Sequence, residues 1–194
     1  MFTILPIKGY IDQIDGFFCD GIHAGLKPNG NNDLGFIYTK EACTVAAIFT
    51  ENRFQAAPLK HFLAYEEGFK TNFVLINSKN ANALTGRKGI EDINTLFSKL
   101  NFDLINPVMS STGLIGNRLP IEKLVTGALK FDLTAKSGEN LSRAIMTTDA
   151  YPKTCLYEVK LEDGSSFKIG AVAKGAGMIN PNLATMLCFI CTDA

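Results

Sequence analysis

Three continuous runs of apolar and β-branched residues constrain the fold of this 194-residue chain more than any other feature of its sequence. They cover residues 43–50, 72–77 and 186–192. A strand with one solvent-exposed face alternates apolar and polar residues, whereas a continuous run is typical of a strand covered on both faces. The three runs therefore predict strands in buried sheets.

Helical periodicity appears in three other parts of the chain. Apolar residues three and four positions apart predict helices over residues 91–100, from Pro120 to residue 129, and over residues 139–146. Proline suits the first turn of a helix, which supports the start of the second one. The chain is thus expected to mix helices with strands.

Shorter strand patterns complete the expected secondary structure. Residues 154–161 and 167–173 predict the two strands of a hairpin, joined by a turn at residues 162–165. Short strands are also expected at residues 17–19 and 34–39. Because the sequence contains no repeat or linker-like stretch, residues 1–194 are expected to form a single domain.

Charge and hydropathy exclude several classes of protein. Lys and Arg total 19, as do Asp and Glu, so the chain lacks the basic excess typical of a nucleic-acid-binding domain. The longest apolar run, residues 186–191, is far shorter than the ~20 residues of a membrane-spanning helix. The first residues have no basic region before an apolar core, so we expect no signal peptide and a cytoplasmic location.

The five cysteines do not suggest a disulfide framework or a metal site. Cys188 and Cys191 form a C-x-x-C pattern inside the last apolar run. Residues three apart on a strand point to opposite faces, so buried structural thiols are expected instead of a redox or zinc pair. His23 and His61 are too few to build a convincing zinc site, and no metal is expected.

Three segments rich in small and polar residues are candidates for chemistry: residues 77–86, 110–116 and 174–187. The first follows a strong strand, where open sheets place ligands, but its asparagines could equally hold the loop backbone. The second could supply oxyanion donors or be an ordinary Ser/Thr/Gly loop. In the third, Thr185 lies between a flexible loop and a strand, either as a nucleophile or as a simple strand-entry residue.

Taken together and in order, these segments resemble the ornithine acetyltransferase family, also called the glutamate N-acetyltransferase or ArgJ family. The resemblance covers nearly the whole chain, and its last block, K-G-x-G-M-I-x-P-N-x-A-T-M-L, is highly specific. The matching segments are Gly21-Ile22-His23-Ala24-Gly25-Leu26-Lys27, Ala46-Ala47-Ile48-Phe49-Thr50-Glu51-Asn52, residues 77–86, Ser111-Thr112-Gly113, Ala144-Ile145-Met146-Thr147-Thr148-Asp149 and residues 174–187. The family usually has glycine where Lys79 stands and cysteine where Leu84 stands.

The resemblance implies an α+β fold, a layered αββα sandwich with helices outside two packed sheets. It also implies a precursor that cuts itself between Ala184 and Thr185. Residues 185–194 would then begin a second, beta chain whose remainder lies beyond this sequence, and the two chains would assemble as an α2β2 heterotetramer.

The resemblance also assigns roles to single residues. Thr185 is the implied nucleophile, because cutting frees an α-amino group whose pKa of about 7.7–8.0 suits it as the base for the threonine hydroxyl. Thr112 and Gly113 match the oxyanion-hole positions. Thr185, Lys174 and one threonine of the pair Thr147-Thr148 match substrate-binding positions, with Thr148 preferred.

The implied reaction moves an acetyl group from N-acetylornithine to glutamate through an acetyl-threonine, in arginine biosynthesis. No cofactor is implied, although acetyl-CoA is a possible second donor. Two alternatives remain open at this point. The chain could belong to an N-terminal-nucleophile amidohydrolase or aminopeptidase, in which water accepts the acyl group, or it could be an inactive fragment.

Overall fold

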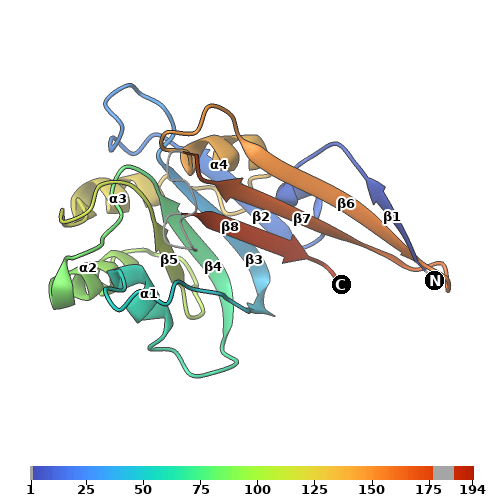
Figure 1. The fold of residues 1–194 in the computed structure, drawn as a ribbon, viewed down its shortest axis with the longest axis horizontal. Helices are drawn as coiled ribbons and strands as arrows, with labels where there is room; N and C mark the ends of the chain where they lie inside the picture. Colours follow the sequence, from blue (N-terminus) through green and yellow to red (C-terminus); the bar gives the residue numbers. More distant parts are fainter. Residues whose placement is uncertain (1, 177–185) are drawn as a thin grey trace.

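The computed structural model describes residues 2–176 and 186–194, which form two four-stranded sheets with helices beside them (Figure 1). Sheet A has the strand order β1-β6-β7-β8, and sheet B has the order β2-β3-β4-β5. The elements are β1 (Phe2–Pro6), a 3-10 turn (Ile11–Gln13), β2 (Phe17–Ile22), β3 (Leu34–Thr44), α1 (Ala57–Phe62), β4 (Lys70–Asn77), α2 (Gly86–Ser98), β5 (Val108–Ser111), α3 (Ile121–Ala128), α4 (Gly138–Ala144), β6 (Lys153–Leu161), β7 (Ser166–Lys174) and β8 (Leu187–Thr192).

Sheet B is covered on one face by α1, α2 and α3. Alternate residues of β3 and β4, such as Leu34, Phe36 and Phe73, point into a core that these helices close with side chains such as Leu96 and Leu124. All five side chains are at most 1% exposed. The helical pattern expected at residues 91–100 arises from this packing, because the apolar stripe of α2 faces the sheet.

The opposite face of sheet B packs against sheet A and α4. Ile37 and Ile76 from sheet B meet Leu156 and Val172 from sheet A in a second core. Leu141 of α4 extends this core at the edge where α4 lies on β2. The expected α+β fold with two packed sheets is confirmed.

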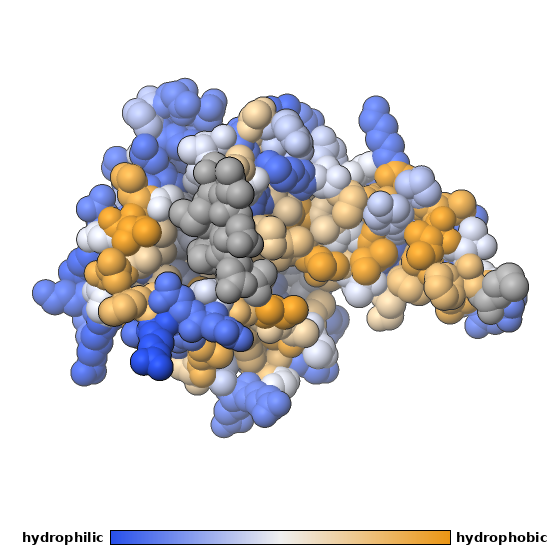
Figure 2. All heavy atoms as spheres, in the orientation of Figure 1, coloured by the Kyte–Doolittle hydropathy of each residue, from blue (hydrophilic) through white to orange (hydrophobic). Residues whose placement is uncertain are grey.

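The outer face of sheet A is apolar and exposed. The strand registers place Phe2, Ile4, Tyr157 and Ile190 on this face, and their side chains are 37–68% exposed. Figure 2 shows hydrophobic residues gathered over this sheet. Among the described residues no helix covers this face. The described residues therefore form three of the four layers of the expected αββα sandwich, namely the two sheets and the helices on sheet B.

Two expectations about the apolar runs are wrong. The run at 43–50 forms a strand only to Thr44, where β3 ends after a bulge, and Ile48 is 84% exposed. A strand needs a paired neighbour, and residues 45–50 pair with no described strand. The run at 186–192 forms β8, but only Cys191 of that strand is buried, because its other face belongs to the exposed face of sheet A.

The other helices and strands expected from the sequence agree with the structure within a few residues. The run at 72–77 lies within β4, and the predicted hairpin is β6 and β7. Cys188 and Cys191 do point to opposite faces, but Cys188 is exposed, so the expectation of two buried thiols holds only for Cys191. None of the described helices is long and apolar enough to cross a membrane.

Candidate active site

The candidate site begins where two parallel strands end side by side. β4 and β5 pair in parallel, and their last residues, Asn77 and Ser111, are partners in the register. The loops that follow are joined by backbone hydrogen bonds from Thr112 N to Asn77 O (3.0 Å) and from Leu114 N to Lys79 O (2.9 Å). Two of the three candidate segments, 77–86 and 110–116, are therefore in direct contact.

Buried asparagine side chains hold the first of these loops. The side-chain amide of Asn77 donates to Asn80 O (2.8 Å), and that of Asn80 donates to Arg118 O (3.0 Å). Asn80 Oδ1 in turn accepts from Asn82 N (2.8 Å). All three asparagines are at most 8% exposed. The alternative in which these asparagines support the loop backbone is the one that the structure shows.

Gly113 lies where the two loops touch, and only glycine fits there. Its φ is +134°, and a Cβ atom at this position would overlap the carbonyl group of Lys79 and lie 2.6 Å from Asn80 N. Gly113 is exposed, and no described residue accepts a hydrogen bond from its amide. An N–H group with no described acceptor, on a tightly held backbone, is suited to bind an oxyanion.

Lys174 brings the third candidate segment to the same place. It is the last residue of β7, its alternation directs it between the two sheets, and it is only 5% exposed. Its Nζ donates to Thr147 Oγ1 (2.6 Å) and to Thr112 Oγ1 (3.2 Å). Since an ammonium can only donate, both threonine oxygens are acceptors here, and their own O–H groups remain free to donate elsewhere.

A buried carboxylate stands behind this lysine. Asp149 Oδ1 accepts from Lys153 Nζ (2.8 Å) and Gly175 N (2.7 Å), and Oδ2 accepts from Thr147 N (3.1 Å). Burial opposes ionisation of this carboxyl, but these hydrogen bonds lower the pKa of Asp149 to about 2. Burial lowers the pKa of Lys174, whereas Asp149 raises it and Lys153 lowers it.

The expected site residues fall into two groups. Lys174 and Thr112 are in contact, and Gly113 directly follows Thr112. Of the threonine pair, Thr147 contacts Lys174, whereas Thr148 is exposed and forms no hydrogen bond with this lysine among the described residues. The preference for Thr148 as a substrate ligand stays a prediction.

Ala184 and Thr185 lie outside the described residues. The described chain stops at residue 176 and resumes at residue 186, and its two parts pair within sheet A, where Leu187 of β8 is the register partner of Lys174 in β7. Met186, the residue after Thr185, lies close to Gly175, because a Cβ atom added to Gly175 would be 3.7 Å from Met186 Cγ. Both flanks of the undescribed stretch therefore reach the lysine.

Sequence reasoning missed the contribution of Asp149. The motif that contains it points to its threonines, and nothing in the motif singles out the aspartate. Its value comes from burial and from partners that are 2 to 26 residues away, which no local pattern reveals.

The Gly21–Lys27 block has a structural explanation as well. Asp33, which is fully buried, accepts hydrogen bonds from the amides of Ala24 (2.7 Å), Leu26 (2.7 Å) and Lys27 (2.8 Å). One carboxylate thus fixes the whole loop between β2 and β3. These residues position the loop and need not take part in chemistry.

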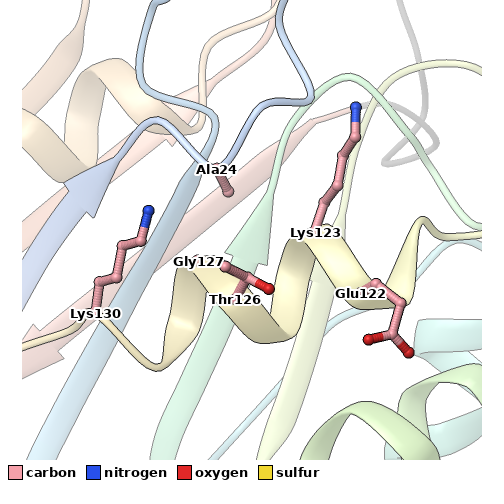
Figure 3. A pocket seen from close by; sticks show the side chains of 6 residues that line it. All are labelled: Ala24, Glu122, Lys123, Thr126, Gly127 and Lys130. Atoms are coloured by element: carbon pink, nitrogen blue, oxygen red, sulfur yellow. The ribbon is translucent and has the colours of Figure 1, made fainter.

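A separate depression of about 250 Å³ lies beside α3 (Figure 3). Lys130 and Lys123 lie at its two ends with Ala24 between them, and the Glu122 side chain extends in the opposite direction (Figure 3). Lys123 Nζ is already bound to Gly25 O (3.0 Å). This depression shares no residue with the Lys174 cluster, so its shape does not alter the choice of site.

Comparison with known proteins shows which family the chain belongs to. The sequence profile of the ArgJ family matches residues 18–194. The "Arginine biosynthesis bifunctional protein ArgJ" of Wolinella succinogenes is 53% identical over all of this chain, and that of Listeria monocytogenes is 38% identical over 97% of it. The chain spans about half the length of these relatives, 50% and 48%.

Two solved structures are similar over almost their whole chains. The arginine biosynthesis bifunctional protein ArgJ of Bacillus halodurans has a TM-score of 0.84 and 33% identity, covering 96% of this chain and 99% of that one. The ornithine acetyltransferase of Mycobacterium tuberculosis, solved in complex with ornithine, has a TM-score of 0.76 and 31% identity, covering 94% of this chain and 100% of that one. The chain belongs to the ArgJ family.

Proposed function

We propose that this chain is the first half of a self-cleaving acetyltransferase of arginine biosynthesis, which moves an acetyl group from N-acetylornithine to glutamate. The observation that carries the proposal is the contact of Lys174 Nζ with the Thr112 and Thr147 hydroxyls, next in the chain to Gly113, whose amide has no described acceptor. It places a cation and three potential oxyanion or substrate donors at the point where β7 and β8 meet. No cofactor is required, and the enzyme is proposed to act in the cytoplasm.

The lengths of the relatives support cleavage into two chains. The curated relatives are about twice as long as this chain, whereas the two similar solved chains are nearly coextensive with it. A cut between Ala184 and Thr185 would produce a first chain of about this length. β8 would then remain paired with β7 and hold the new N-terminus near Lys174.

The chemistry follows from the groups at the site. The cut converts the amide nitrogen of Thr185 into an amine that accepts the proton of its own hydroxyl. The hydroxyl attacks the acetyl carbonyl, ornithine leaves, and glutamate later attacks the acetyl-threonine. The Thr112 hydroxyl and the Gly113 amide stabilise the oxyanion, and each such donor is worth about 3–4 kcal/mol in comparable enzymes.

Lys174 suits the substrates that the proposal names. Both carry an α-carboxylate, and a lysine ammonium has three N–H groups, of which the two threonine hydroxyls use two. No described residue accepts a hydrogen bond from the third, which is proposed to bind a carboxylate. The Mycobacterium tuberculosis enzyme was solved with ornithine bound, which supports an amino acid as ligand. Thr148 is kept as a further substrate contact, and acetyl-CoA as a possible second donor.

The remainder of the proposed beta chain, after β8, would cover the outer face of sheet A. This face exposes large apolar side chains such as Phe2, Ile4 and Ile190, which is costly for a protein that works in water. Burying the face against the second chain, within an α2β2 assembly, removes that cost. In the assembled protein the exposed thiols of Cys155 and Cys188 should then resist alkylation.

The test is mass spectrometry and assay of the full-length gene product. Wild-type protein should give two polypeptides that split before Thr185, and it should move acetyl from N-acetylornithine to glutamate. Thr185→Ala should remain uncut and inactive, Thr185→Ser should still be cut, and Thr95→Ala on the exposed surface of α2 should behave as wild type. A Thr185→Ala protein that is still cut at the same bond would refute the proposal.

The same samples separate the alternatives. Deacetylation of N-acetylornithine at the same rate with and without glutamate would indicate an amidohydrolase. A single uncut and inactive wild-type chain would indicate an inert protein.

A further inference from the structure

The Asp149 carboxylate binds Thr147 N, Lys153 Nζ and Gly175 N, and so connects three parts of the chain around the site. We infer that Asp149 is a positioning residue for maturation and acetyl transfer, because it fixes the backbone at Gly175 and Thr147 on either side of Lys174. The inference rests on the proposed function, since it concerns the same site.

The bond to Gly175 controls where the chain leaves sheet A. Gly175 directly follows Lys174, the last residue of β7, and begins the segment that leads to residues 177–185. Its amide donates to Asp149 Oδ1 at 2.7 Å. Because the Asp149 side chain is fully buried, its carboxylate can hold this amide in one place and so set the direction in which the segment toward the scissile bond departs.

The bond to Thr147 controls the threonine that Lys174 contacts. Asp149 Oδ2 accepts from Thr147 N at 3.1 Å, which closes a tight turn between α4 and β6. The Thr147 hydroxyl is thereby directed at Lys174 Nζ, with an oxygen-to-nitrogen distance of 2.6 Å. The two oxygens of one carboxylate therefore hold the backbone at Gly175, next to the lysine, and at the threonine that the lysine contacts.

The carboxylate acts through its charge and its fixed geometry. Its pKa of about 2 keeps it ionised at any working pH, so it accepts hydrogen bonds on both oxygens and is a poor proton acceptor for a threonine hydroxyl. No threonine hydroxyl among the described residues contacts it. Asp149 therefore does not suit the role of general base in the reaction.

A competing explanation is that Asp149 only neutralises Lys153. The two side chains form an ion pair of 2.8 Å, and Lys153 is 31% exposed and lies over the Tyr151 ring. The bonds of Asp149 to Gly175 and Thr147 do not involve Lys153. Removing the lysine charge therefore breaks the ion pair while leaving both backbone contacts of Asp149, and this difference separates the two explanations.

The experiment compares Asp149→Asn, Lys153→Met and the double variant in the full-length gene product, with Asp163→Asn as control. Asp163 is an exposed carboxylate that also accepts a backbone amide, Ser165 N at 2.9 Å, but in the turn between β6 and β7. The asparagine side chain keeps one acceptor oxygen, whereas its amide nitrogen cannot accept from a backbone N–H. Intact mass follows the cutting rate, and steady-state assays give kcat and KM.

We expect Asp149→Asn to slow cutting and to lower kcat by about 10- to 100-fold, the usual effect of misplacing reacting groups by about 1 Å. Lys153→Met and Asp163→Asn should change either rate by less than about threefold. The double variant should behave as Asp149→Asn. It leaves no unpaired charge at the buried position, so it supplies the same reading if the single variant does not fold.

The pH dependence of kcat/KM provides a second measurement, because a purely structural defect would lower kcat/KM without shifting the pH at which it falls. The charged groups that act on Lys174 are Asp149, Lys153 and Lys27. Burial has the largest effect and lowers the pKa of Lys174, whereas the Asp149 carboxylate raises it. Asp149→Asn should therefore move the alkaline limb of kcat/KM to lower pH, and Asp163→Asn should leave it in place.

Suppose that the wild-type protein is cut and transfers acetyl. If Asp149→Asn then has the same rates as Lys153→Met or as the wild type, the inference about Asp149 is overturned and the proposed function stands. An uncut and inactive wild-type protein would overturn the proposed function and this inference with it.

Discussion

Replacing Gly113 by alanine tests whether the contact between the two loops builds the oxyanion site. The new methyl group would overlap the Lys79 carbonyl and lie 2.6 Å from Asn80 N, and both groups are backbone that cannot rotate away. Strain at a φ of +134° costs about 1–3 kcal/mol, and forced overlap costs about 1–3 kcal/mol more. We therefore expect a loss of about 2–6 kcal/mol in the free energy of unfolding.

Gly116 provides a matched control in the same loop. Its φ is also positive, +88°, but a Cβ there would meet nothing within 4 Å. Gly116→Ala should therefore lose only the free energy of backbone strain, about 1–2 kcal/mol. With similar backbone strain in both variants, the difference between them is the cost of pushing the loops apart, about 1–3 kcal/mol.

The assay is urea unfolding of the full-length gene product, combined with the rate of acetyl transfer. With a slope of about 2 kcal/mol per molar, a difference of about 3 kcal/mol separates the two midpoints by about 1.5 M. Gly113→Ala should also lose transfer by about 100-fold or more, because the amide moves with the loop. Equal midpoints for the two alanine variants, together with unchanged transfer in Gly113→Ala, would refute the reasoning.

Three further predictions concern single side chains. Lys174→Met should lower kcat/KM by about 100-fold or more without lowering stability, because it removes a buried charge while keeping apolar volume; this is checked by steady-state assay and thermal unfolding. Asp149 has a pKa of about 2 in the folded chain against an ordinary 3.8, so it contributes about 2 kcal/mol above pH 4. That contribution is lost as the pH falls from about 4 to 2, and the stability gap between wild type and Asp149→Asn should narrow over the same range in urea unfolding. Lys79→Gly should raise stability by about 0.5–1 kcal/mol in urea unfolding, because Lys79 holds a φ of +76° that glycine adopts without strain.

Lys79 also shows how far the resemblance to the family reaches. The family usually has glycine there, and the lysine of this chain keeps the left-handed backbone that favours glycine. The contacts with the Gly113 loop therefore hold the backbone at Lys79 in this conformation, although lysine is strained at a positive φ. A departure from the family pattern at this residue is compatible with the loop backbone that the site needs.

The secondary structure could be predicted where its cause is local. Helix α2 follows from an apolar stripe, and the hairpin of β6 and β7 follows from a turn sequence between two strand patterns. The strand expected at residues 43–50 failed because strand formation depends on a distant partner, and beyond Thr44 the described chain offers none. β1, α1 and β5 escape prediction because each is short and lacks a clear periodicity.

The candidate site could be predicted only through the family resemblance. Composition and spacing left the loop that contains Thr112 and Gly113 with two alternatives, and only the ordered set of motifs favoured chemistry there and singled out Lys174. Asp149 could not be found either way, because its role depends on burial and on amides from other elements. A buried carboxylate that accepts hydrogen bonds from several backbone amides can be recognised in a structure, but no local sequence pattern reveals it.

The geometry of the site depends on how the two sheets pack. Thr112 follows β5 of sheet B, whereas Lys174 ends β7 of sheet A, and the two meet at 3.2 Å. That distance is fixed by the core between the sheets, where Ile76 and Val172 pack, one residue before Asn77 and two before Lys174. Lys174 therefore reaches Thr112 only in the fully packed fold. Under the proposed function, a precursor with loose sheet packing would lack this constellation, so cutting would follow folding and would not precede it.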